Sequence, residues 1–377
     1  MAISRAFLNS QRYDEAKGSI NNTYTSPIII NGDMNVTQRG DQTGVTAEKY
    51  TTADRFVINI SSLGTWSFSS STDTPGFGFS KSLKIDCTTA DGSPASSDNM
   101  YLTQLIEGQN LQMMRKGTAS AKTSTVAYWI KSNKTGNYVV ELWDRTNDRH
   151  VGKVATISQA NTWEKHVCNF PADTSGALAN TNARSIMISW AFDAGSNFTS
   201  GTLPSAWGSK SDANRFVGTT LALGDSTDNE VLITGVQFEM GTYDSETMPP
   251  FQFEDATTSL LRCQRYTQVF GGNNTKETFG QGSCQTATVQ AVVIKHNTTM
   301  RTTPSISVSA VGDFQVTSAS AFAEAATSIS INTTNSGTTM AYVTLNTASN
   351  ANSTLGRVAQ IRAGDTTDAR FIISAEL

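Results

Sequence analysis

An alternation of apolar and polar residues with a period of two constrains this chain more than any other feature of its sequence. In residues 185–192, Ile186, Ile188, Trp190 and Phe192 alternate with small or polar positions, as in a strand that buries one face. Polar or glycine-containing turns separate such runs, and residues 132–137 (SNKTGN) have the composition of a hairpin connection. The pattern predicts antiparallel sheets rather than helices.

The composition supports the same fold class. Only 38% of the residues are hydrophobic and 16% are charged, and Ser, Thr and Asn take much of the remainder. Thr is β-branched, whereas Ser and Asn compete with the helical backbone for hydrogen bonds, so this mixture disfavours helices. We therefore expect an all-β protein with long polar loops.

A chain of 377 residues is long enough for two or three domains. Residues 1–30 predict an N-terminal anchoring segment with one short amphipathic helix, and residues 31–253 predict a jelly-roll β-sandwich. Residues 254–377 predict a smaller C-terminal β domain that begins with a helix running into a strand. The strands of the sandwich are expected at residues 55–60, 83–87, 101–106, 126–130, 138–142, 163–170, 186–192, 216–223 and 231–240, with a helical turn at 107–116. Because the last domain is poor in large apolar residues, we expect copies of the chain to complete it.

Several classes of protein are not expected. The chain lacks an apolar run long enough to span a membrane, and its net charge of −4 without a basic block disfavours a nucleic-acid partner. Its four cysteines form no CxxC pair, which predicts buried free thiols rather than a zinc or redox site.

Catalytic signatures are also missing from the sequence. There is no phosphate-binding glycine loop, no HExxH and no GxSxG, and the three histidines are far apart. Loop carboxylates leave room for a glycosidase pair, but their spacing marks no two of them as convergent. We expect no enzyme, no catalytic residue, no cofactor and no specified metal ligand, although a structural Ca²⁺ would suit the oxygen-rich loops.

Two sets of residues are candidates for binding. Trp143 follows Leu142, which is expected to point inward, so the alternation places Trp143 on the opposite face beside Glu141 and near Asp144. An aromatic ring with neighbouring carboxylates can hold a sugar. The alternative is that this tryptophan covers an end of the sandwich or a subunit contact.

The second set lies in polar loops of the C-terminal domain. Asn273, Asn274 and Thr275 form one loop, and Asn332 and Asn335 lie in another. Their amides and hydroxyls can bond to sugar hydroxyls, with Tyr266, Phe270 and Phe279 as the nearby aromatics. If residues 1–30 anchor the chain, the loops of the C-terminal domain lie at the distal end and are reached first by a binding partner, so we expect contact here rather than at Trp143.

A series of short motifs gives the chain a family resemblance. It begins with residues 30–40 (INGDMNVTQRG) and 53–56 (ADRF). The later motifs are 106–111 (IEGQNL), 129–132 (WIKS), 161–165 (NTWEK), 195–198 (GSNF), 233–241 (ITGVQFEMG), 250–253 (PFQF), 261–266 (LRCQRY), 300–304 (MRTTP) and 374–377 (SAEL). Together they resemble a module frequent in tail-fibre and other appendage proteins of tailed bacteriophages, marine phages especially.

The resemblance implies a sandwich similar to carbohydrate-binding modules and a small β head, in a homotrimeric virion appendage. It implies assembly in the reducing host cytoplasm and attachment to other tail or capsid proteins through residues 1–30. The function that it favours is that of a tail fibre or spike that attaches to host surface polysaccharide or lipopolysaccharide. The alternatives are a capsid-decorating or tail-adaptor protein with a purely structural role and, less favoured, a polysaccharide depolymerase. It also implies that Trp163 belongs to the core.

Overall fold

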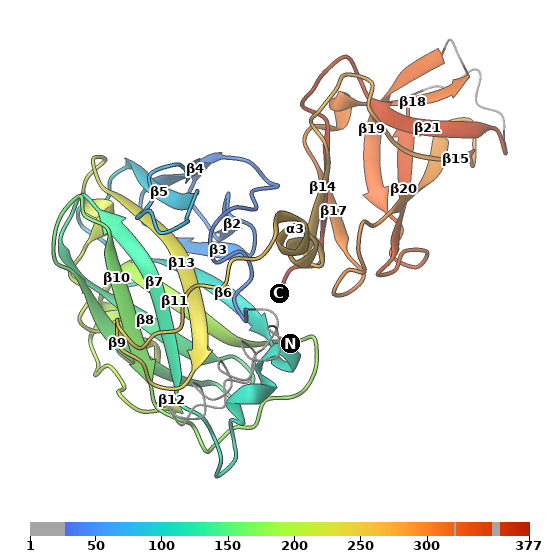
Figure 1. Ribbon diagram of the computed structural model, residues 1–377. Helices are drawn as coiled ribbons and strands as arrows, with labels where there is room; N and C mark the ends of the chain where they lie inside the picture. The colour runs from blue at the N-terminus through green and yellow to red at the C-terminus, as the bar shows by residue number, and fades with distance from the viewer. Residues whose placement is uncertain (1–26, 320–321, 349–354) are drawn as a thin grey trace, which may run out of the picture.

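The computed structural model of the chain describes residues 27–319, 322–348 and 355–377. These residues form two β lobes with helix α3 between them (Figure 1). The expected all-β fold, with a sandwich followed by a smaller β domain, is confirmed. Most of the expected anchoring segment, residues 1–26, lies outside the described residues.

The larger lobe is a sandwich of two antiparallel sheets. The six-stranded sheet has the order β1 (Gln42–Val45), β4 (Thr65–Ser71), β5 (Ser82–Thr89), β13 (Glu230–Met240), β7 (Ser124–Ser132) and β10 (Glu164–Phe170). The seven-stranded sheet has the order β12 (Gly208–Ser209), β9 (Arg149–Ile157), β8 (Gly136–Asp144), β11 (Arg184–Ala194), β6 (Asn99–Glu107), β3 (Phe56–Ser61) and β2 (Lys49–Tyr50). Its short helices are η1 (Gly108–Met114), α2 (Ser196–Thr199), η2 (Asp212–Asn214) and η3 (Leu223–Asp225).

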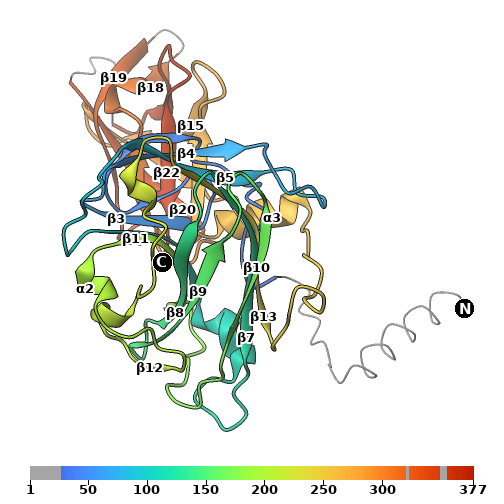
Figure 2. The same ribbon diagram turned by 90° about the vertical axis from the view of Figure 1, so that its left-hand side faces the viewer.

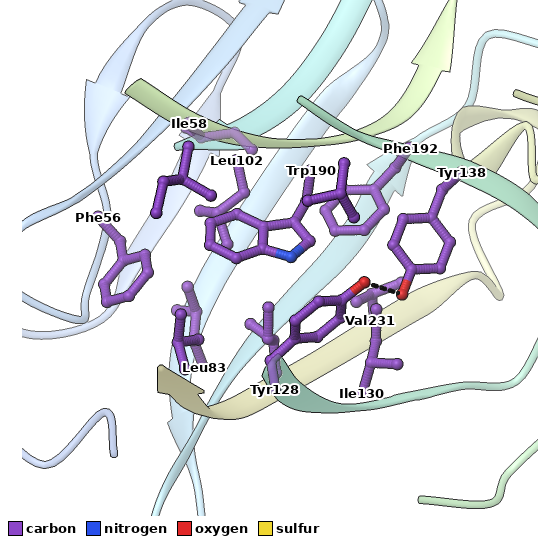
Figure 3. Close-up of a cluster of buried hydrophobic side chains, with 14 of the residues drawn as sticks. Phe56, Ile58, Leu83, Leu102, Tyr128, Ile130, Tyr138, Trp190, Phe192 and Val231 are labelled. Atoms are coloured by element: carbon purple, nitrogen blue, oxygen red, sulfur yellow. Dashed lines mark hydrogen bonds between the residues drawn. The ribbon is translucent and has the colours of Figure 1, made fainter. Parts of the chain in front are cut away.

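The core of the sandwich lies between the two sheets and follows the period-two alternation. Trp190 of β11 is fully buried and contacts Tyr128 of β7 edge to face at 5.6 Å. The hydroxyls of Tyr128 and Tyr138 share a hydrogen bond of 2.6 Å between the two sheets (Figure 3). The Tyr138 hydroxyl also lies 2.6 Å from Nδ1 of His166. The buried hydroxyls are therefore satisfied, as burial in an apolar core requires.

One strand that the sequence predicts for the sandwich is not present in the structure. Residues 216–223 form no strand; they belong to an excursion between β11 and β13 that contains α2, η2 and η3. Phe216 of this excursion is buried against Val139 and Ala191 on the outer face of the seven-stranded sheet. Figure 2 shows α2 beside this sheet, on the side away from the six-stranded one. The apolar residues of this segment therefore cover the seven-stranded sheet and do not form one of its strands.

The C-terminal lobe begins with α3 (Ala256–Gln264), whose first turn is capped by Asp255 accepting from the amides of Thr257 and Thr258. A three-stranded sheet follows, in the order β14 (Thr267–Gly271), β22 (Arg370–Ser374) and β17 (Ser305–Val308). Beside it is a closed barrel of β15 (Thr278–Cys284), β16 (Val289–Lys295), β20 (Met340–Thr347), β19 (Phe322–Ile331), β18 (Phe314–Ala319) and β21 (Val358–Ala363), with η4 (Val311–Asp313). Closure pairs every strand edge of this barrel, and its interior has its own apolar cluster.

Buried polar contacts join the two lobes. Arg55 of the sandwich forms an ion pair with Glu376, and its guanidinium lies 3.5 Å from the centre of the Tyr266 ring. The Tyr266 hydroxyl donates to Glu107 at 2.6 Å, and Arg265 pairs with the same carboxylate at 3.1 Å. Arg55 and Glu107 therefore take their partners of opposite charge from the C-terminal lobe.

The four cysteines are buried and form no disulfide, as the sequence predicts. We expect thiol titration of the denatured, unreduced protein to find four reactive groups, the number of cysteines in the chain. A protein assembled in a reducing cytoplasm keeps its thiols. A titration that finds two or none would contradict this assignment.

In the ranges that the structure describes, no helix has the length and apolar character needed to cross a membrane.

Candidate functional site

The expected loops of the C-terminal domain are exposed, but they lack a stacking ring. The backbone and side-chain amides of Asn273 donate to Glu277 at 3.3 and 3.4 Å, while Asn274 and Thr275 face solvent. The aromatic residues expected beside them are used elsewhere. Tyr266 is buried at the junction, and Phe279 packs on Phe371 with a centroid distance of 5.0 Å.

The second loop is a hairpin turn between β19 and β20. Oδ1 of Asn332 accepts from the backbone amide of Asn335 at 3.1 Å, so this side chain stabilises its own turn. The turn contacts the segment after β16, where the amide of His296 donates to the carbonyl of Thr339 at 3.0 Å. Within the described residues, no hydrogen bond brings this loop together with Asn273–Thr275.

The carboxylates expected beside Trp143 are not on the surface. Glu141 is 0% exposed and binds Arg215 at 2.8 Å and His150 at 2.9 Å. Asp144 is equally buried and pairs with Lys116 at 2.5 Å. The excursion between β11 and β13 supplies Arg215 and covers this part of the sheet, which sequence alternation alone does not reveal. The expected sugar-binding set of Trp143, Glu141 and Asp144 therefore needs correction, because both carboxylates are held by protein cations.

An exposed aromatic surface lies on the other side of the sandwich, on the outer face of the six-stranded sheet. Trp129 of β7 lies between Tyr128 and Ile130, which point into the core, so its ring points away from the core. Phe77, from the loop between β4 and β5, stacks on Trp129 with a centroid distance of 5.1 Å and an interplanar angle of 18°. Phe77 is 75% exposed, which leaves an aromatic ring open to solvent.

Polar groups lie beside these rings. The carboxylate of Asp73 accepts from the indole nitrogen of Trp163 at 2.9 Å and pairs with Lys131 at 2.6 Å. Partial burial raises the pKa of Asp73, but the hydrogen bonds from Lys131 and Trp163 outweigh it and hold the pKa below its usual value. Asp73 is therefore ionised at neutral pH. We call Phe77, Trp129 and Trp163, with Asp73 and Lys131, the aromatic platform.

The backbone under Phe77 is strained. Gly76, Phe77 and Gly78 have φ values of 82°, 51° and 91°, and an aromatic residue with positive φ is an outlier. Such a conformation costs on the order of 1–3 kcal/mol, and it is found where surrounding structure or function maintains it. Because the ring it carries is exposed, burial of that ring does not explain the strain.

A bulge in β13 makes room for the rings. The register of β13 against β7 shifts between Thr234 and Gln237, and Gly235 has a φ of 64°. A Cβ atom at Gly235 would lie 2.7 Å from Phe79 and 3.0 Å from Trp129. Glycine is therefore required here both by the backbone conformation and by the aromatic side chains above it.

Trp163 was expected in the core, but it is half-buried and lies outside the core cluster of the sandwich. Sequence reasoning also missed Phe77 and Trp129. The signals were present, because Trp129 alternates with two inward residues and Phe77 lies in a glycine-flanked loop, residues 75–79 (PGFGF). The sequence does not show that this loop crosses the sheet and places Phe77 on Trp129 of β7.

The structure also contains a cavity of about 360 Å³ at the junction of the lobes. Its walls include Ile28, Met113, Arg262, Arg265 and Tyr266. Arg262 is paired with Glu254 and Arg265 with Glu107, so neither guanidinium is left for a ligand anion. Across the described residues, no group of three His, Cys, Asp or Glu side chains comes together as a metal site would need.

Comparison with known proteins gives distant structural likenesses. No protein-family model matches the chain, and no curated protein matches it. Among solved structures, a tailspike protein 4 domain of bacteriophage CBA120 aligns with 57% of this chain and 21% of its own, at 11% identity and a TM-score of 0.29. A putative sugar-binding protein from Bacteroides thetaiotaomicron aligns with 57% of this chain and 100% of its own, at 12% identity and a TM-score of 0.31. A family 11 carbohydrate-binding module of Clostridium thermocellum aligns with 53% and 99%, at 8% identity and a TM-score of 0.27.

Proposed function

We propose that this chain is a virion attachment protein of a tailed bacteriophage that binds host surface glycans through the aromatic platform. The observation that carries the proposal is the exposed, strained Phe77 ring stacked on Trp129. A sugar presents an apolar CH face that packs on such a ring, and its hydroxyls need donors and acceptors at the edge. Asp73 and Lys131 supply them here.

The platform suits a glycan better than the C-terminal loops do. Those loops offer amides and hydroxyls, but the rings near them are packed into the barrel core or the junction. Hydrogen bonds to sugar hydroxyls replace hydrogen bonds to water and yield little net affinity alone. Stacking adds the removal of apolar surface from water. Of these two described surfaces, the platform is the one that combines stacking with polar groups.

The virion role rests on the series of tail-appendage motifs in the sequence. In this proposal the protein is a homotrimer on the tail or capsid surface, attached to other virion proteins through residues 1–30. Host polysaccharide or lipopolysaccharide is its ligand, and binding rather than cleavage is its activity. A purely structural adaptor or decorating protein would not need an exposed ring on a strained loop.

Phe77→Asn in the full-length chain tests the proposal. Asn tolerates positive φ better than Phe, so we expect thermal stability to stay the same or rise while glycan affinity falls. The loss of one central aromatic contact is expected to weaken binding by about 1–2 kcal/mol, roughly 5- to 30-fold. Binding is measured by calorimetry against polysaccharide purified from the host.

Leu355→Asn is the matched control, because Leu355 is 74% exposed and lies in the C-terminal lobe. We expect it to leave affinity unchanged. If Phe77→Asn binds host polysaccharide as tightly as the parent chain, the platform is not the binding site. A lowered melting temperature with unchanged affinity would assign Phe77 a structural role instead.

A further inference from the structure

Trp143 lies on the opposite face of the sandwich from the aromatic platform. It is a half-buried residue of β8, and its neighbour Leu142 points into the core between the two sheets. Its indole nitrogen donates to Asp148 at 3.1 Å, which fixes the orientation of the ring. The surface around Trp143 can therefore be considered separately from the platform.

Three cations surround this ring. The guanidinium carbon of Arg145 lies 3.9 Å from the ring centre, that of Arg215 lies 4.6 Å away, and the Lys210 ammonium lies 4.8 Å away. Arg215 is neutralised by Glu141, and Lys210 pairs with Asp212 at 2.5 Å. Because cations already occupy its surroundings, Trp143 is poorly placed to stack on a neutral sugar.

Two arginines at this surface have no such neutralising partner. In the described parts of the chain, no carboxylate lies within ion-pairing distance of Arg145 or Arg184. Their backbones lie side by side, since the amide of Arg145 donates to the carbonyl of Ser185, the residue after Arg184, at 2.8 Å. Burial, together with the positive charges of Arg184 and Arg215, lowers the pKa of Arg145 from its ordinary value, and Tyr101 and Asp148 oppose this shift only in part. Positive charge is thus in excess around Arg145.

An anion would relieve this excess. A guanidinium presents a planar fork of donors that matches a carboxylate or phosphate, and it remains charged at all ordinary pH values. Arg145 is held in place by its stacking on Trp143, so less side-chain freedom is lost when it binds. Arg184 is exposed and can approach the same group.

We propose that Arg145, which Trp143 orients, and the neighbouring Arg184 form a second ligand site that binds the carboxylate or phosphate group of an acidic saccharide. The site does not depend on the aromatic platform. It assigns an acidic ligand to the face on which the sequence predicts sugar binding by Trp143, Glu141 and Asp144. Asp148 borders the site, since it accepts from the Trp143 indole and its charge acts on Arg145, and we expect it to weaken the affinity for an anion.

Calorimetry on the full-length chain tests the site with a glucuronic acid oligosaccharide and the matched glucose oligosaccharide. Arg145→Gln is expected to weaken binding of the acidic oligosaccharide about tenfold or more, because charge-assisted hydrogen bonds are lost. Asp148→Asn is expected to tighten it severalfold. Asn keeps the acceptor for Trp143 and suits the φ of 50° at this position, so a gain in affinity cannot arise from misfolding.

Further measurements separate the alternatives. Lys295→Gln, an exposed cation of the C-terminal barrel, removes the same charge and is expected to leave binding unchanged. Binding of a sugar phosphate tests whether a phosphate group on a saccharide replaces the carboxylate, and inorganic phosphate tests whether a free ion is enough. If inorganic phosphate binds as tightly as the acidic saccharide, the saccharide part of the proposal is wrong. Equal affinity for the acidic and neutral oligosaccharides, or no effect of Asp148→Asn, would overturn the anion site. Phe77→Asn leaves the Arg145 site intact, so the test of the aromatic platform and the test of the anion site can fail independently of each other.

Discussion

Replacing Glu376 by Gln is expected to lower the free energy of unfolding by about 3–5 kcal/mol. Arg55 is 1% exposed and forms its ion pair with Glu376, whose other oxygen binds Arg39 at 2.9 Å. Gln preserves the shape of the side chain but not its charge, so the buried Arg55 guanidinium loses the carboxylate that pairs with it and keeps only uncharged acceptors, such as the carbonyl of Leu105 at 2.8 Å. Urea denaturation followed by far-UV circular dichroism measures the loss.

The control for this variant is Glu246→Gln, an exposed carboxylate of the sandwich, which is expected to change stability by less than about 0.5 kcal/mol. The double variant Arg55→Met with Glu376→Met is expected to recover much of the lost stability, because a buried ion pair replaced by apolar groups is often neutral. A loss under about 1 kcal/mol for Glu376→Gln alone would show that the junction does not depend on this pair.

The contacts between the two lobes also affect experiments on isolated fragments. Separating them would expose Glu376 and the Tyr266 ring and leave Arg55 and Glu107 without partners from the other lobe. Isolated fragments would then lose stability for reasons unrelated to binding. Binding of host glycans is therefore best assigned with point variants of the whole chain.

The alternation in the sequence was enough to predict most strands and the orientation of their side chains. Trp190 is buried and Trp143 points away from the core, as their positions along β11 and β8 predict. Alternation says which face a residue occupies, but it does not say what covers that face. Glu141 lies on the outer face and is nevertheless fully buried, because Arg215 and Phe216 of a distant excursion pack over it.

The candidate site was harder to predict for the same reason. Asn332 lies in an exposed loop as expected, yet its side chain bonds to its own turn. Phe77 lies in a loop without periodicity, so no local pattern places it on Trp129. Stacking of Phe77 on Trp129 depends on tertiary placement of the loop and on the bulge at Gly235, which a single sequence does not specify.

Replacing Glu141 by Gln is expected to cost about 3–5 kcal/mol of stability at neutral pH. Arg215 would keep its buried position, 4% exposed, and lose the only carboxylate that the described structure places against it. Arg215 ties the excursion to the seven-stranded sheet, so we expect this segment to open first. Hydrogen exchange of the amides in residues 195–222 measures that opening, while urea denaturation measures the global loss.

The effect of Glu141→Gln should also depend on pH with a definite sign. Burial raises the pKa of Glu141, but the Arg215 charge and the hydrogen bonds from His150 and Arg215 outweigh it and hold the pKa below the ordinary value of 4.5. The unfolded chain therefore binds this proton more readily, so the contribution of Glu141 is complete above pH 4.5 and is lost as the pH falls through its folded-state pKa. We expect the stability gap between the parent chain and Glu141→Gln to narrow below that pH, whereas Glu246→Gln stays close to the parent throughout. A gap that keeps its full size in acid would mean that packing of the excursion, and not the charge of Glu141, holds it on the sheet.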